Sequence, residues 1–290
     1  MNGLRTKEGF LPRLEKTFFY KGGEYKIKVT PAIIDSDDGK EKAYYPSANE
    51  EVVEDALRKI AAEQKKGFFD KSDFKSGVVF SLHLLRAELK KRGHSRSYYE
   101  IVKSLNILSG SHIEILLPDG KGFAKTNYLP SLAAVSRQKL NDDPEAKWIA
   151  QFHPLVTRCI DTLSFRQYNY HQMMSHSTQL ARWLHKKLSH NYTNASCIVP
   201  YQLWLSSICR DSGLLEYKRP NNVVRKLEEA LTELKDHSVL IAFSREEDTR
   251  GKQNKILDIK YSLSPHPEFV REVKAANKRQ KESLESPPTR

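Results

Sequence analysis

The side chains best suited to chemistry in this 290-residue chain are hydrogen-bond donors on one face of a predicted helix. Asn222 and Arg225 lie on the face opposite Leu227 of that helix, on a wheel of 100° per residue, and Asn221 lies beside them. Arginine binds guanine through two hydrogen bonds, and asparagine binds adenine in the same way. These three residues are therefore predicted to contact base edges. The alternative is an ordinary solvated helix in which Arg225 pairs with Glu229.

A second group of polar and aromatic side chains lies in the first half of the chain. Arg96, Tyr99, Lys103 and Asn106 share the solvent face of another predicted helix. They are predicted to contact DNA bases in the same manner. A solvated helix at a dimer or interdomain interface fits this spacing equally well.

Basic residues around both helices are predicted to contact DNA phosphates, because lysine, arginine and the first N–H groups of a helix all bind phosphate. Lys218 and Arg219 precede the helix that contains Arg225, and Arg182, Lys186 and Lys187 lie on an upstream helix. The second hairpin contains Arg245, Arg250, Lys252 and Lys255, and the first hairpin contains Lys121 and Lys125. A solvated basic surface is the alternative for each group.

The overall charge favours a polyanionic partner. The chain has 48 Lys and Arg against 36 Asp and Glu, a formal charge of +12, which fits nucleic acid or an acidic membrane face. No apolar run approaches the roughly 18 residues of a membrane span, so no membrane partner is expected. The cysteines, Cys159, Cys197 and Cys209, lack CxxC spacing, and a reducing, cytoplasmic location is expected.

Several catalytic motifs are absent from the sequence, among them a phosphate-binding P-loop, HExxH, His-x-His and GxSxG. His185 and His190 are five residues apart on a predicted helix and do not face each other, so no metal ligand is expected. We therefore expect no catalytic residue, metal or cofactor, and no enzymatic activity. A DNA-nicking transferase that uses Tyr168 or Tyr170 is the enzymatic alternative.

The elements that would position these side chains follow the same order in both halves of the chain. In the first half, β-rich residues 17–46 precede helices at 49–66, 78–92 and 97–108 and a hairpin of strands at 112–117 and 123–128. In the second half, a long helix at 168–190 precedes a strand at 197–199, helices at 200–210 and 220–236, and strands at 239–243 and 256–263. Helix, turn, capped helix and hairpin are the parts of a winged helix.

The predicted fold class is therefore α+β, with two tandem winged helix-turn-helix domains. Residues 1–140 form the N-terminal domain, for dimerisation or accessory DNA contact, and residues 148–265 form the C-terminal domain, for specific DNA reading. Polar residues 136–147 are interpreted as the joint between them. Residues 266–290 are predicted to be a charged, flexible tail.

Four segments of the second half carry a family resemblance. They are Phe152–Val156, Leu163–Tyr170, Gln179–Leu188 and Ser189–Tyr192, and the Arg-Trp-Leu-His-Lys helix followed by Ser-His-Asn-Tyr is the most specific. Over roughly residues 148–263 the chain resembles plasmid replication initiators of the TrfA/RepA type. The N-terminal third matches no family that we identify.

The resemblance implies a bacterial initiator that binds direct repeats, called iterons, at a plasmid origin. It further implies origin opening, recruitment of the host initiator and replicative helicase, and a balance between monomer and homodimer. The alternatives are a tandem winged-helix transcriptional regulator without a replication role and a winged-helix adaptor that binds protein.

Overall fold

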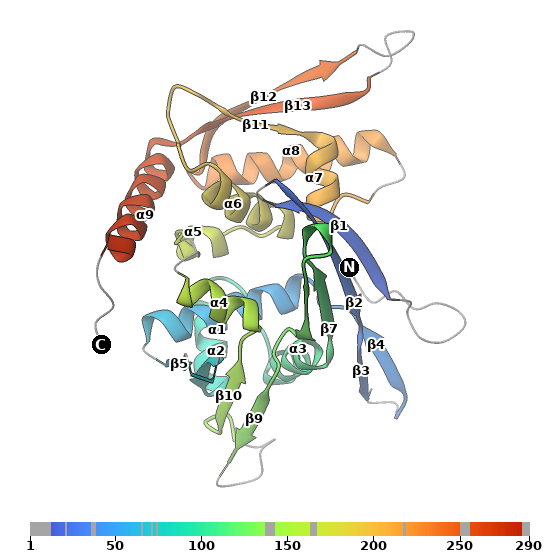
Figure 1. Ribbon diagram of the computed structural model, residues 1–290, viewed down its shortest axis with the longest axis vertical. Helices are drawn as coiled ribbons and strands as arrows, with labels where there is room; N and C mark the ends of the chain where they lie inside the picture. The colour runs from blue at the N-terminus through green and yellow to red at the C-terminus, as the bar shows by residue number, and fades with distance from the viewer. Residues whose placement is uncertain are drawn as a thin grey trace. The chain divides into compact units, whose positions relative to one another are not determined.

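The computed structural model divides the chain into two compact units, Met1–Thr162 and Leu163–Arg290 (Figure 1). It describes residues 13–20, 22–35, 39–64, 66–70, 72–73, 75–136, 143–162, 167–216, 219–249 and 256–285. The division lies further along the chain than the joint predicted at 136–147. The reason is that strands β9 (Leu132–Val135) and β10 (Lys147–Gln151), on either side of that segment, pair with each other inside the first unit.

The first unit contains two antiparallel four-stranded sheets, of order β1-β2-β7-β8 and β5-β6-β10-β9, together with the short pair β3-β4. Its other elements are β1 (Leu14–Tyr20), β2 (Gly23–Thr30), β3 (Ala32–Asp35), β4 (Glu41–Tyr44), α1 (Ala48–Glu63), β5 (Gly67–Asp70), β6 (Lys75–Phe80), α2 (Leu82–Lys91), α3 (Tyr98–Gly110), β7 (His112–Leu116), η1 (Pro118–Gly120), β8 (Phe123–Asn127) and α4 (Pro154–Asp161). The predicted hairpin β7-β8 is thus the outer half of a sheet that β2 and β1 continue.

The helices predicted in the first unit are present, and each buries apolar residues on one face. Leu57 of α1, Leu85 of α2 and Leu105 of α3 are completely buried. Helix α2 starts at Leu82 rather than at 78, because the apolar residues 78–80 belong to β6, which pairs with β5 and β10. Short apolar runs fit a buried strand as well as a helix, and here the sheet decides.

The second unit follows the winged-helix order of helix, strand, two helices and a long hairpin (Figure 1). Its elements are α5 (Tyr170–Met174), α6 (Gln179–Asn191), β11 (Tyr201–Trp204), α7 (Leu205–Ser212), α8 (Pro220–Asp236), β12 (Leu240–Asp248), β13 (Asp258–Pro265) and α9 (Pro267–Glu285). The three strands form one antiparallel sheet of order β11-β13-β12.

Three predicted elements at the start of this unit are wrong. The predicted helix 168–190 is interrupted between α5 and α6, because Thr178 caps α6 by accepting a hydrogen bond from the backbone N–H of Ala181 at 3.2 Å. The strand predicted at 197–199 lies instead at β11, and the following helix begins at Leu205.

Residues 267–285 form a helix, so the flexible tail predicted for 266–290 is wrong over that range, and residues 286–290 lie outside the described residues. Helix α9 buries Phe269, Val270 and Val273 in the core of the second unit. Asn277 also donates a hydrogen bond to the backbone carbonyl of Thr193 at 2.7 Å. Charged residues dominate the composition of this segment, but its few apolar residues are spaced to share one helical face.

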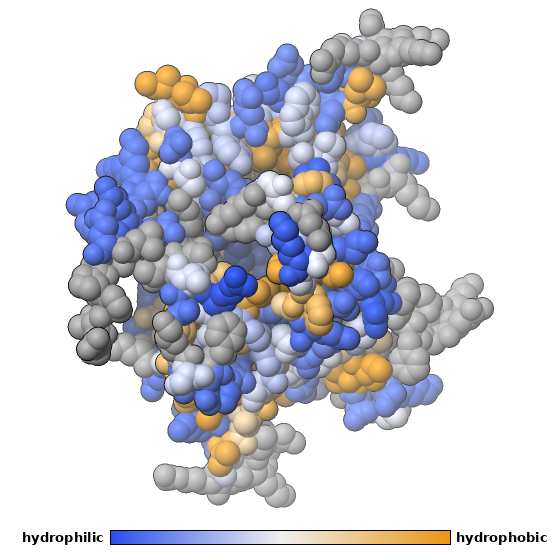
Figure 2. Space-filling model, viewed as in Figure 1, coloured by the Kyte–Doolittle hydropathy of each residue, from blue (hydrophilic) through white to orange (hydrophobic). Residues whose placement is uncertain are grey.

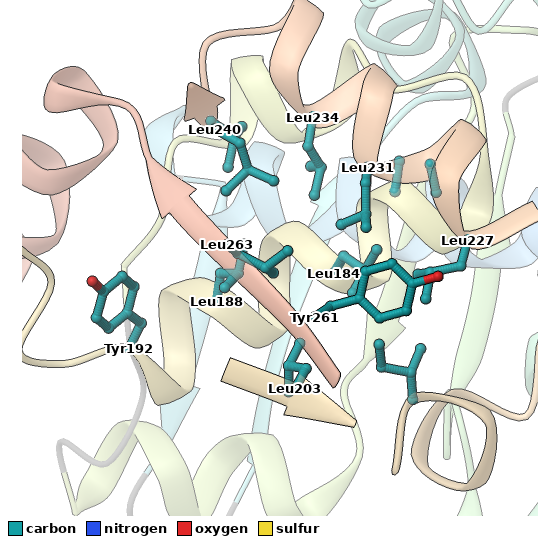
Figure 3. Close-up of a cluster of buried hydrophobic side chains, with 14 of the residues drawn as sticks. Leu184, Leu188, Tyr192, Leu203, Leu227, Leu231, Leu234, Leu240, Tyr261 and Leu263 are labelled. Atoms are coloured by element: carbon teal, nitrogen blue, oxygen red, sulfur yellow. The ribbon is translucent and has the colours of Figure 1, made fainter. Parts of the chain in front are cut away.

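The core of the second unit lies between α6, α8, α9 and the sheet. Figure 3 shows Leu184 of α6 and Leu227 and Leu231 of α8 gathered around Tyr261 of β13. On the molecular face in Figure 2, hydrophilic side chains predominate and apolar ones form small separate groups. Within the described residues, we find no helix with the length and hydrophobicity that crossing a membrane requires.

Candidate nucleic-acid interface

Helix α8 presents the predicted base-contacting residues to solvent. Leu227, Leu231 and Leu234 are completely buried and fix the rotation of the helix about its axis. Asn221 and Arg225 are consequently exposed and Asn222 is half-buried. The structure therefore brings together the three donors that the sequence placed on one face.

The N-terminal turn of α8 has the features of an anion-binding site. Pro220 occupies the first helical position, the N-cap residue Arg219 makes no side-chain hydrogen bond to the helix, and the first turn contains no acidic residue. Pro220 has no N–H, and the backbone N–H of Asn222 donates to the carbonyl of Arg219 at 3.0 Å. This turn therefore offers a phosphate the N–H of Asn221 and the positive end of the helix dipole. Arg219 is exposed beside them.

An open groove runs along α8 between α7 and the β12-β13 hairpin. Its lining includes Asn221 and Arg225 from α8 and Arg245 from β12. Acidic residues hold both arginines, with nitrogen–oxygen distances of 2.6 Å for Arg225 and Glu229 and 2.9 Å for Arg245 and Glu228. The alternative pair predicted for Arg225 is thus formed, but exposed pairs of this kind are weak in water.

These ion pairs shift the pKa values of Glu229 and Arg245. A hydrogen bond from Lys226, supported by the charge of Arg225, lowers the pKa of Glu229. The charge of Glu228 raises the pKa of Arg245. Each arginine can exchange its carboxylate partner for a phosphate or a base.

Four predicted phosphate contacts lie outside the described residues. They are Lys218 before α8 and Arg250, Lys252 and Lys255 between the strands of the hairpin. The resemblance segment at 163–166 lies outside them as well.

The upstream helix α6 uses two predicted phosphate contacts for internal structure instead. Arg182 is 2% exposed, and its guanidinium donates to the backbone carbonyls of His176 and Ser177 at 3.0 and 3.1 Å. The phosphate role predicted for Arg182 is therefore wrong, because the break before α6 provides carbonyls that need a buried donor.

Lys187 on the same helix is also held internally. Its ammonium lies 2.8 Å from the Asp211 carboxylate and 5.0 Å from the ring centre of Trp183. Burial alone would raise the pKa of Asp211, but hydrogen bonds from Arg210 and Lys187 hold it below its ordinary value. Lys187 thus joins α6 to α7, which corrects its predicted phosphate role, whereas Lys186 is half-exposed and its predicted role stays open.

Helix α3 of the first unit differs from α8 at its N-terminus. Ser97 and Glu100 form a capping box, in which backbone N–H groups already have acceptors. The hydrogen bond from the Ser97 backbone N–H lowers the pKa of Glu100, so a carboxylate occupies this end. Such an end offers much less attraction to a phosphate than the end of α8.

The predicted base contacts of α3 are also partly engaged. Arg96 donates to the side-chain oxygen of Asn49 at 2.7 Å, and the Lys103 ammonium lies 4.4 Å from the ring centre of Tyr44. Tyr99 and Asn106 are exposed. In the adjoining hairpin, Lys121 and Lys125 are exposed too, and Lys125 lies directly opposite Glu114.

Comparisons with known proteins support the fold. No family model and no curated protein sequence match this chain. A selenomethionine crystal structure of domains 2 and 3 of RctB is similar, with a TM-score of 0.53, 11% identity and coverage of 91% of this chain and 94% of that chain. A second structure of RctB domains 2–3 gives a TM-score of 0.50, 12% identity and coverage of 93% and 98%.

A structure of the Pi initiator protein in complex with iteron DNA has a TM-score of 0.43 and 11% identity, covering 76% of this chain and 94% of that chain. The fold comparison rests on the RctB structures, whose likeness spans both units of this chain. The predicted fold class, mixed α and β in tandem winged-helix domains, is thereby confirmed.

Proposed function

We propose that this chain is a replication initiator that binds direct repeats in double-stranded DNA at a plasmid origin. In this proposal the second unit reads the repeat through α8, and it acts by binding DNA rather than by catalysis. The first unit supplies dimerisation or accessory DNA contact. Recruitment of the host initiator and replicative helicase, in the bacterial cytoplasm, completes the proposed role.

The observation that carries the DNA-binding part is the first turn of α8. It combines a helix start without a side-chain cap, no acidic residue, and the exposed side chains of Asn221 and Arg225 beside a long hairpin. An α-helix fits the major groove, and winged-helix proteins place the N-terminal part of their third helix there. The acidic residues Glu228 and Glu229 follow one turn later, which favours insertion of the N-terminal end alone.

The initiator class rests on the resemblance of residues 148–263 and on the tandem arrangement. Two winged-helix units in one chain suit a site that extends over two turns of duplex DNA. If both third helices enter major grooves on one side of the DNA, their centres lie about 10.5 bp apart. The net charge of +12 supports phosphate binding over such a length.

The proposal is tested by quantitative binding of the full chain to duplex DNA over a salt series. The probes are direct repeats from non-coding DNA beside the gene, with random duplexes of equal length as control. We expect the repeat to bind about 10³-fold or more tighter than random DNA. Equal affinities that vanish together near roughly 200 mM salt would contradict sequence-specific binding.

Plasmid maintenance distinguishes an initiator from a transcriptional regulator. Deletion of the gene abolishes replication from the adjacent origin if the chain is an initiator, and supplying the chain in trans restores it. Specific binding with unaffected replication would instead identify a regulator.

A further inference from the structure

Three side chains of the second unit converge at the end of α8 opposite the candidate DNA interface. They are His176, from the turn between α5 and α6, Glu233, from the last turn of α8, and His237, the C-cap of that helix. One nitrogen or oxygen of each lies within 4.8 Å of the others. Imidazole nitrogen and carboxylate oxygen are common ligands of zinc.

The two imidazoles face each other with the same type of ring nitrogen. The Nδ1 atoms of His176 and His237 are 2.9 Å apart, and the rings are stacked with their centres 5.0 Å apart. Two lone pairs at that distance repel unless a proton or a cation lies between them. His176 is completely buried, and burial, with the charge of His237 adding to it, lowers its pKa to about 4. A neutral imidazole is the form that binds a metal.

His185 provides the contact that a metal-binding histidine needs on its other side. Its Nδ1 lies 3.0 Å from Nε2 of His176. When His176 donates its Nε2–H to that atom, the lone pair of its Nδ1 points toward His237. The ring of Phe269, from α9, packs edge-on against His185 with centres 5.9 Å apart. This packing encloses the imidazole of His185, which in turn fixes the orientation of the His176 ring.

The remaining groups around this space also present acceptors. The Glu233 carboxylate accepts hydrogen bonds from the backbone N–H of Ser177 and from the backbone and hydroxyl of Thr178. Burial raises its pKa, but these hydrogen bonds outweigh burial and keep it ionised. The backbone N–H of Thr178 lies within hydrogen-bond distance of both carboxylate oxygens, so four hydrogen bonds reach Glu233 in total. Two carboxylate oxygens offer about four lone-pair directions, so a cation bound here shares or displaces one of these hydrogen bonds. Ser175 donates its hydroxyl hydrogen to the carbonyl of Gln172, so its oxygen presents lone pairs 3.2 Å from Nδ1 of His237.

We propose that His176, His237 and Glu233 form a zinc site that joins the turn before α6 to the end of α8. Two nitrogens bound to tetrahedral zinc at 2.0–2.1 Å lie about 3.3 Å apart. The imidazoles therefore need to separate by only about 0.4 Å from the 2.9 Å observed. A solvent molecule reaches the fourth position past His237, which is only half-buried.

This site is independent of the proposed DNA-binding role. Eight residues separate Arg225 from Glu233, a rise of about 12 Å along α8. Zinc here stabilises the second unit and touches none of the predicted DNA contacts. Failure of zinc binding would therefore leave the proposed function untouched, and the reverse also holds.

The test measures Zn²⁺ and Co²⁺ binding to the full chain by calorimetry, visible absorption and thermal unfolding. We expect one equivalent to bind, cobalt bands typical of nitrogen and oxygen ligands without a thiolate band, and an increase in Tm of the second unit of roughly 5–10 °C. His237→Gln, which alters a half-buried side chain, lowers the affinity at least about tenfold. Glu233→Gln acts in the same direction.

The matched control is His171→Gln, which removes an exposed histidine from α5 and leaves affinity unchanged. Circular dichroism and DNA binding verify that each variant is folded. Absence of binding at roughly 100 µM Zn²⁺, or equal affinity of His237→Gln and the unmodified chain, would overturn the proposal. A thiolate band that Cys197→Ser abolishes would also overturn it, since the metal would then sit on the exposed cysteine.

Discussion

Both units contain two successive helices followed by a hairpin, α2-α3-β7-β8 and α7-α8-β12-β13, but the helices before the hairpins, α3 and α8, begin in opposite ways. Helix α3 starts with a capping box from Ser97 and Glu100, whereas α8 starts at Pro220 without a side-chain cap. A carboxylate thus occupies the positive end of α3, while the positive end of α8 faces solvent. A capping residue typically stabilises a helix by about 1 kcal/mol. Helix α8 lacks this stabilisation, and its first turn offers a ligand the N–H of Asn221 and the positive end of the dipole.

The residues around the helices follow the same division. In the first unit, Arg96 and Lys103 contact Asn49 and Tyr44 of neighbouring elements. In the second unit, the pair of Arg225 is with Glu229 on the same helix and is fully at the surface. The comparison teaches that two winged-helix units can present very different surfaces at the same place in the fold. If the proposed function holds, the state of the first turn of α3 and α8 is what separates the reading unit from the accessory one.

The largest expected effect is a loss of stability of the second unit when the packing of α9 against its core is weakened. Phe269 is 1% exposed in its core, and replacing a buried phenylalanine by alanine costs about 3–5 kcal/mol. We expect Phe269→Ala to lower the unfolding transition of the second unit and leave that of the first unchanged, in denaturant unfolding followed by circular dichroism. Lys274→Ala, on the exposed side of α9, is the control. Equal stability of both variants would restore the flexible-tail interpretation.

The next effect addresses base reading by α8. Arg225→Ala is expected to weaken binding to the specific repeat by about 1–3 kcal/mol and to relax specificity at one base pair. Lys235→Ala removes the same charge from the last turn of α8 and serves as the control. Binding to a library of single-base variants measures both quantities. If the two variants lose the same affinity, charge rather than base contact explains Arg225.

A smaller pair of effects tests the first turn of α8, which has no side-chain cap. One substitution there is expected to raise the stability of the helix and to lower its affinity for DNA. Asn221→Asp places a carboxylate at the second helical position of α8, which stabilises the helix by about 0.3–1 kcal/mol. The same carboxylate repels phosphate, so affinity for all DNA falls and the salt slope becomes shallower by roughly one unit. Thermal unfolding and binding at several salt concentrations measure the two changes. Asn221→Ala is the uncharged control. Unchanged DNA affinity of Asn221→Asp would contradict a phosphate contact at this turn.

Much of the fold could be predicted from local pattern. The stripe of α8 at Leu227, Leu231 and Leu234 and its start at Pro220 are found where the sequence indicates them. Periodicity and capping residues act within one turn of helix, so they are readable without tertiary structure. Asn221 and Arg225 were placed correctly at the surface for the same reason.

The failures have two causes, namely local breaks in the chain that periodicity does not show and contacts between residues distant in sequence. Arginine is usually found at the surface, but Arg182 is buried because the helix is interrupted at Ser177, which leaves backbone carbonyls that accept its hydrogen bonds. Strand β6 is defined by pairing with β10, about 70 residues later. The histidine cluster was missed because His176 and His237 are 61 residues apart. No spacing rule covers that separation, and only the packed structure brings the rings together.

The smallest expected effect is on DNA affinity after substitutions in the first unit. It tests whether that unit reads bases or plays an accessory role. Arg96→Ala and Lys103→Ala break contacts inside the first unit, and we expect each to change affinity for the repeat less than fivefold, under about 1 kcal/mol. A footprint should keep its protection over the half-site bound by α8. Tyr99 and Asn106 stay exposed on α3, so Tyr99→Ala combined with Asn106→Ala is the stricter version. A loss as large as that of Arg225→Ala would show that a capped helix also reads bases, and the comparison between the two first turns would no longer hold.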